Sequence, residues 1–171
     1  MRKIFVIGIL LCAPAGVFAL NAYAGKPETL EPPINITEVV ERDGNIYSIA
    51  KSGEEIPLTS SGADFEPSLS TDQKWVTFVR ENPKIMVEFD FPDGLESLFP
   101  ARGIWVVAAD GSAAPRLVTN QVVAWHNPEQ KFYAVFKNPT FSNNNSEIYF
   151  LAPGWVTSDA LCAVDLLDSS T

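Results

Sequence analysis

The residues that could perform acid–base or nucleophilic chemistry are few and widely separated in this sequence. His126 is the only histidine, and it precedes Asn127-Pro128, a pair that favours a solvated turn residue over a general base. No G-x-S-x-G segment supplies a serine on a sharp strand-to-helix turn. Because no nucleophile, base and orienting group can be assembled, we predict no catalytic residue.

A short run of carboxylates offers the main alternative, an enzyme of the glycoside hydrolase kind. Such enzymes place two carboxyl groups on either side of the glycosidic bond, and the run contains Glu88, Asp90, Asp93 and Glu96. In the segment MVEFDF, however, the acidic residues alternate with apolar ones, which is typical of an edge strand with one solvated face. The oxygen-rich turns lack the regular spacing of a calcium loop, so we predict neither a metal nor a cofactor.

Aromatic residues form the better candidate for a functional surface. Trp125, Phe132 and Tyr133 lie in the segment Gln121–Phe136, which we predict to be a hairpin turning at Asn127-Pro128. Aromatic residues in strands usually belong to the core. If this hairpin lies at a sheet edge, the three side chains instead form an exposed patch that contacts a partner.

The elements that carry these residues are short strands rich in β-branched and aromatic residues. Several alternate with period two, and no window of a dozen residues has the apolar spacing of a helix. One helical turn around Gly94–Phe99 is the best helical candidate. We therefore predict an all-β protein with strands at residues 36–41, 45–50, 55–59, 74–80, 85–91, 103–108, 121–126, 132–136, 147–151 and 160–166.

The sequence also repeats itself. EPSLSTDQKWVTFV (66–79) returns 72 residues later as NPTFSNNNSEIYFL (138–151), and NIYSIAKSGEEIPLTS (45–60) matches GIWVVAADGSAAPRLVTN (103–120). Each full unit consists of four antiparallel strands, which is the unit of a β-propeller blade. The repeat units cover about 45–60, 66–119 and 138–171, with insertions near 82–102 and 120–137.

These motifs resemble the TolB-type β-propeller repeats, also called PD40 or WD40-like repeats. The residues that carry the resemblance are Pro67, Ser70 and Asp72 in the first copy, Pro139 and Ser142 in the second, and Asp110 and Gly111 in the connecting hairpin. Two departures are that Leu69 and Phe141 stand where the family has tryptophan. The resemblance implies a periplasmic scaffold that holds protein partners such as envelope proteins.

The number of repeats predicts an incomplete propeller of two to three blades. A closed propeller typically has at least four, and open sheet edges promote aggregation unless they are covered. Three explanations stay open. The chain completes a ring as a homo-oligomer, its insertions cover the open edges, or it is a truncated remnant of a longer propeller.

The N-terminus resembles a secretory signal. Residues 1–24 combine Arg2 and Lys3 with an apolar run and end in Ala22-Tyr23-Ala24, a small-x-small cleavage pattern. Residues 25–34 are a polar, proline-rich linker, and we assign 35–171 to the partial propeller. From residue 25 onward 10 basic residues face 21 acidic ones, a net charge of −11, which argues against nucleic acid and anionic membranes as partners.

Together these features predict an exported, periplasmic or secreted, protein-binding module with no membrane span after removal of the signal. A hydrolase or an accessory domain of a propeller peptidase is the alternative. A single cysteine, Cys162, follows the signal, so no internal disulfide is expected.

Overall fold

The structure is a computed structural model that describes residues 35–90, 96–124, 126–155 and 158–166, all within one compact unit spanning residues 33–171. The predicted signal peptide, with Ala22 and Ala24, and the linker lie outside the described residues. The described chain is all-β: it forms several small antiparallel sheets, none of which closes into a barrel. The predicted fold class is confirmed at this level, and the sheets are consistent with incomplete propeller-like blades.

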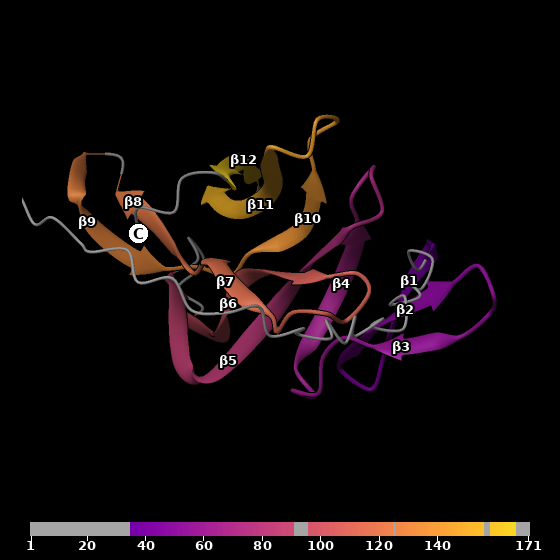
Figure 1. Ribbon diagram of the computed structural model, residues 1–171. Helices are drawn as coiled ribbons and strands as arrows, with labels where there is room; N and C mark the ends of the chain where they lie inside the picture. Colours follow the sequence, from indigo (N-terminus) through magenta and orange to yellow (C-terminus); the bar gives the residue numbers. More distant parts are fainter. Residues whose placement is uncertain (1–34, 91–95, 125, 156–157, 167–171) are drawn as a thin grey trace, which may run out of the picture. The chain divides into compact units, whose positions relative to one another are not determined.

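Three sheets and one separate hairpin account for the strands (Figure 1). In every sheet the strands lie side by side in chain order, so each connection is a hairpin between antiparallel neighbours. The first sheet contains β1–β3, the second β4–β7 and the third β10–β12, while β8 and β9 pair only with each other. The bounds are β1 Ile36–Arg42, β2 Asn45–Ala50, β3 Glu55–Pro57, β4 Asp64–Leu69, β5 Trp75–Asp90, β6 Glu96–Ala108, β7 Arg116–Thr119, β8 Gln121–Ala124, β9 Asn127–Tyr133, β10 Lys137–Phe141, β11 Glu147–Trp155 and β12 Ser158–Asp165.

The three sheets correspond strand by strand to the repeat in the sequence. The second sheet has all four strands, and β10, β11 and β12 occupy the places of β4, β5 and β6. In the first sheet β1, β2 and β3 occupy the places of β5, β6 and β7. Among the described residues, the first sheet shows no equivalent of the first strand, β4, and the third shows none of the last, β7.

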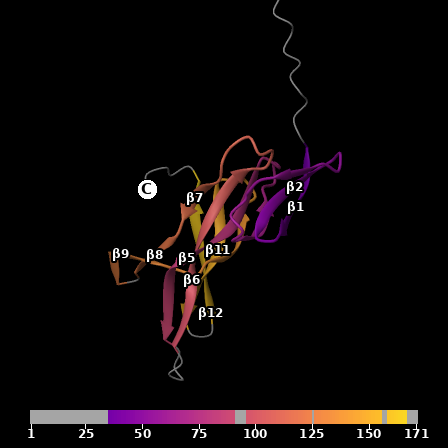
Figure 2. The ribbon, with the colours of Figure 1, turned by 90° about the horizontal axis from the view of Figure 1, so that it is seen from below.

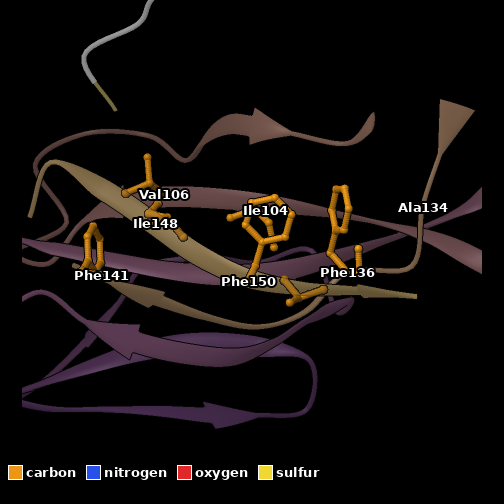
Figure 3. Packing of buried hydrophobic residues seen from close by; sticks show 9 residues of the cluster. Ile104, Val106, Ala134, Phe136, Phe141, Ile148 and Phe150 are labelled. Carbon is orange, nitrogen blue, oxygen red and sulfur yellow. The ribbon is translucent and has the colours of Figure 1, made fainter. Parts of the chain in front are cut away.

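Both faces of the second sheet are buried. Val76 and Phe78 point to one face and pack with Ile46 of the first sheet, whereas Val79 and Ile104 belong to a cluster with residues of the third sheet. The alternation of side chains along β5 produces this division, because neighbouring residues of a strand face opposite ways. Figure 3 shows the second cluster, in which residues of β6, β10 and β11 meet.

The turns that join the first two strands of the second and third sheets are built alike. Ser70 Oγ donates to Asp72 Oδ1 at 2.6 Å, and Ser142 Oγ donates to Asn144 Oδ1 at 2.7 Å. Each serine oxygen also accepts the backbone amide five residues further on, at 3.0 and 3.1 Å. Both serines are buried, and each closes its turn by accepting a backbone amide as well as donating to a side chain.

The left-handed residue in these turns is not glycine. Gln73 has φ 61° and Asn145 has φ 58°, although asparagine adopts this region more readily than glutamine. The two turns also touch, since Thr71 Oγ1 donates to Asn145 Oδ1 at 2.9 Å. Serine-centred hydrogen bonds therefore hold the turn shape without a glycine at the left-handed position.

One glycine permits a close approach between two loops. Asp43 and Gly44 both have positive φ, 52° and 70°, as a two-residue hairpin turn between twisted strands requires. A Cβ on Gly44 would lie 2.3 Å from the carbonyl oxygen of Gly62. Any other residue at position 44 would push this turn away from the chain that enters β4.

Three details of the prediction differ from the structure. Residues 96–99 of the expected helical turn at Gly94–Phe99 belong to β6, because they pair antiparallel with residues 87–90 of β5. The turn of the inserted hairpin comes before Asn127-Pro128, since Ala124 already pairs with Asn127 and both 127 and 128 lie in β9. Two expected strands, 74–80 and 85–91, are also joined in β5, with an irregularity between Asn82 and Met86.

Candidate functional site

The two inserted segments meet at one edge of the second sheet. The first lengthens β5 and β6 beyond the rest of the sheet, and the second forms the β8–β9 hairpin (Figure 2). After β9 the chain returns to β6, where the Arg102 amide donates to the Ala134 carbonyl oxygen at 2.9 Å. The hairpin is therefore tied to β6 at its base.

A pocket of about 150 Å³ lies at this junction. Arg80 of β5, Gly103 and Trp105 of β6 and Leu117 of β7 contribute from the sheet, and Tyr133 contributes from β9. Gly103 is packed against its neighbours, because a Cβ there would lie 3.2 Å from Leu117 Cδ1 and 3.3 Å from Trp105 Nε1. A side chain at position 103 would thus press on the pocket wall.

Arg80 is held rigidly in the pocket wall. Its Nε and Nη2 atoms donate to the two carboxylate oxygens of Asp64 at 2.5 and 2.8 Å, a bidentate geometry. Its guanidinium carbon lies 4.5 Å from the centroid of the Trp105 ring and 5.4 Å from that of Phe78. The Asp64 side chain is fully buried. Movement of the Arg80 guanidinium away from it would therefore leave a buried carboxylate without an ion-pair partner, which is strongly unfavourable.

A second arginine strengthens the same edge. Glu81 and Arg102 are direct cross-strand partners, and Arg102 Nε and Nη2 donate to Glu81 Oε1 at 3.1 and 2.8 Å. The Arg102 guanidinium lies 4.8 Å from the centroid of the Phe65 ring. Both residues are among those that line the pocket. Their side chains and Phe65 lie on the face of the sheet opposite to Arg80, so this ion pair stabilises the pairing of β5 with β6.

The apolar side of the pocket is open to solvent. Leu117 is 42% exposed and Tyr133 is 36% exposed. Val123 pairs with Lys131 two positions along from the Gln121–Tyr133 pair, so it lies on the same face of the hairpin as Tyr133. We call Leu117, Val123 and Tyr133 the pocket rim.

The structure divides the predicted aromatic patch. Phe132 and Tyr133 are consecutive residues of one strand, so they point to opposite faces of the hairpin. Phe132 pairs with Val122, which packs against the core cluster, yet Phe132 itself is 47% exposed. Trp125 lies outside the described residues. Of the three, Tyr133 is the residue that the structure places at the pocket.

The predicted repeat residues lie in strands and turns and do not line the pocket. Pro67 and Pro139 are in β4 and β10. Asp110 and Gly111 form the turn after β6, where Gly111 has φ 73°. Hydrogen bonds from Ser112 to the carboxylate lower the pKa of Asp110. These residues shape the sheets.

The remaining candidates for chemistry stay apart from one another. Glu88 is exposed on the part of β5 that pairs with β6, and the side chains of Asp90, Asp93 and Glu96 lie outside the description. His126 is exposed in the hairpin turn. Within the described ranges no three His, Cys, Asp or Glu residues gather where they could hold a metal ion. Cys162 is half-buried beside the core, and that burial raises the pKa of its thiol.

Comparison with protein-family models and with curated proteins finds no match for this chain. In the part of the chain that is described, no helix is long and apolar enough to cross a membrane.

The pocket was not predicted from the sequence. Trp105 falls under the general expectation that aromatic residues in strands belong to the core. Arg80 and Asp64 drew no attention because 16 residues separate them. One signal was available: the strand TEVVER ends in Arg42 as the strand WVTFVR ends in Arg80. An arginine at the same place in two repeats indicates a shared contact, and each guanidinium does lie over an aromatic ring, Tyr47 and Trp105 respectively.

Proposed function

We propose that this chain is an exported, TolB-like propeller-type module that binds a protein partner at the pocket and its rim. The observation that carries the proposal is the combination of an open apolar rim with a rigid, stacked Arg80–Trp105 wall. Aromatic and arginine side chains around a pocket are the composition of binding hot spots. A volume of about 150 Å³ suits one protruding side chain of a partner.

The chemistry of the partner follows from that of the wall. The ring face of Trp105 and the side chains of Leu117 and Tyr133 favour an apolar or aromatic group. Arg80 is already neutralised by Asp64, so it contributes orientation more than net attraction. Since residues 25–171 carry a net charge of −11, a partner with a basic surface would associate faster. Envelope proteins are the class of partner that the sequence resemblance implies.

Photocrosslinking in the cell envelope tests the proposal with a matched pair of positions. A photoreactive amino acid at Tyr133 should crosslink to a discrete second protein, and the same group at Phe132 should not, because it faces the other way. The Leu117→Ser variant should weaken the crosslink from position 133. Equal crosslinking from both positions, or none from either, would contradict binding at the pocket.

A further inference from the structure

The outer faces of the first and third sheets are the places in this fold where the repeat pattern is interrupted. In each sheet, residues at equivalent positions of equivalent strands point toward the same side, either toward the preceding sheet or toward the following one. Along the chain the first sheet packs on the second and the second on the third. In the part of the chain that the structure describes, no sheet precedes the first to cover its other face, and none follows the third.

Strand register shows which residues occupy the equivalent places on these two faces. Leu161 pairs with Leu151 as Ile104 pairs with Val79, so Leu161 is the third sheet's counterpart of Ile104. Leu161 is 73% exposed, whereas Ile104 is fully buried. Ala163, two residues further along β12, is also exposed. An apolar face that is buried in the second sheet is therefore open in the third.

The first sheet offers the complementary face. Val40 pairs with Tyr47 as Phe78 pairs with Trp105, and the 72-residue repeat makes Phe150 the counterpart of Phe78. Val40 is thus the counterpart of Phe150. Val40, Tyr47 and Ile49 are half-buried on the face of the first sheet that points away from the second.

These counterparts already pack together within the chain. Ile104 and Phe150 belong to the same buried cluster, and Figure 3 shows them among its central side chains. From this packing we infer that two copies of the chain assemble into one closed ring, with the third sheet of each copy on the first sheet of the other. Leu161 of one copy then lies against Val40 of the next, as Ile104 lies near Phe150.

The number of sheets selects two copies. The described residues of each chain contribute three sheets of the repeat, and propellers typically have 4–8 blades. One chain gives three blades, which is too few, and three chains give nine, which is too many. Two chains give six. The contact is head-to-tail, and it closes because two copies complete the circle.

Sedimentation velocity of the full chain, expressed so that the cell processes its N-terminus, tests the ring. We expect a dimer at micromolar concentration. The variants Leu161→Glu and Val40→Glu should each give monomers, a twofold loss of mass, because a charge is placed in the contact. Leu98→Glu is the matched control, since Leu98 is 62% exposed on β6 and away from both faces; it should stay dimeric.

Disulfide crosslinking tests the head-to-tail arrangement in a Cys162→Ala background. Copies with Val40→Cys mixed with copies with Leu161→Cys should form a covalent dimer on oxidation, and neither variant alone should do so. A wild-type monomer, a species larger than a dimer, dissociation of Leu98→Glu, or crosslinking of one variant with itself would each overturn the ring. None of these outcomes depends on the pocket, so the ring and the proposed function can fail separately.

Discussion

The second and third sheets have the same strand order and the same serine-centred turn, yet they differ in what covers them. In the second sheet Val79 and Ile104 are fully buried, because a neighbouring sheet covers each face. In the third, Leu151 is half-buried and Leu161 is 73% exposed at the corresponding places. The residues at these positions are apolar in both sheets. The apolar pattern of the sequence therefore indicates which face of a sheet can pack against a neighbour. The structure shows whether a neighbouring sheet packs on that face.

We expect the largest difference in the free energy of unfolding between alanine substitutions of Ile104 and of its counterpart Leu161. Ile104→Ala removes buried methyl groups from a packed cluster and should lower the free energy of unfolding by about 2–5 kcal/mol. Leu161→Ala in dilute protein should change it by less than about 0.5 kcal/mol, as exposed sites usually do. Urea denaturation followed by tryptophan fluorescence measures both. Similar losses for the two variants would show that Leu161 is covered within a single chain.

The arginines of the first two sheets give a second contrast. Asp64→Ala leaves Arg80 without its buried partner and should lower the free energy of unfolding by about 3 kcal/mol, the low end for a buried pair, because Arg80 is 22% exposed. Its counterpart Arg42 pairs with Glu55, and both are about half exposed, so Glu55→Ala should cost less than about 1 kcal/mol. Thermal unfolding of the two variants checks this order.

The two serine turns should respond equally. Ser70→Ala and Ser142→Ala each remove the acceptor of a backbone amide, that of Trp75 and of Glu147 respectively. Each change should lower the free energy of unfolding by about 0.5–1.5 kcal/mol. Ser61→Ala is a suitable control, because Ser61 Oγ also accepts a backbone amide, that of Ala63 at 3.1 Å, but is exposed. A loss in one turn only would show that the similar geometry hides different energetics.

The smallest effect concerns the carboxylate of Asp72, which stands where the other turn has Asn144. The hydrogen bond from Ser70 lowers the pKa of Asp72. A group whose pKa is lowered by folding stabilises the protein above its unfolded pKa, and this contribution is lost as pH falls through the folded pKa. Asp72→Asn gives this turn the uncharged side chain of the other turn. The free energy of unfolding of this variant should fall less steeply on acidification between about pH 5 and pH 3. Asn144→Asp should steepen the fall.

Comparison of the denaturation midpoints of these two variants with wild type across that range measures the effect. If Asp72→Asn leaves the acid dependence unchanged, the Ser70 bond does not favour the ionised carboxylate.

Much of the fold was readable from the sequence, because strand alternation and repeat spacing are local or periodic signals. The all-β class, most strand positions and the four-strand unit follow from residues such as Trp75 to Val79. The expected helical turn at residues 94–99 failed since a weak local preference was overridden by pairing with β5. The register irregularity between Asn82 and Met86 falls at the gap between two predicted strands and contains Pro83, which has no amide proton for the ladder. That β5 continues through this irregularity was not predicted, because pairing with β6 decides it.

The pocket was harder to predict for a physical reason. Its wall depends on a contact between Asp64 and Arg80 that forms only when β4 pairs with β5. Its rim depends on how the β8–β9 hairpin returns to β6 at Arg102. Tyr133 was selected from its aromatic character alone, and its separation from Phe132 required knowing that both lie in a strand.

The contact between the two turns has a consequence for how reliably the chain folds. Neighbouring repeats of similar sequence can exchange strands and trap the chain in wrongly assembled forms. Thr71 and Asn145 are places where the two copies differ, and Thr71 donates to the Asn145 side chain and to the Asn143 carbonyl oxygen at 2.9 and 3.2 Å. An exchange of β4 with β10 would put Thr71 and Asn143 in each other's places and lose these bonds. The differences between the two copies thus favour the correct strand arrangement over the one in which β4 and β10 are exchanged.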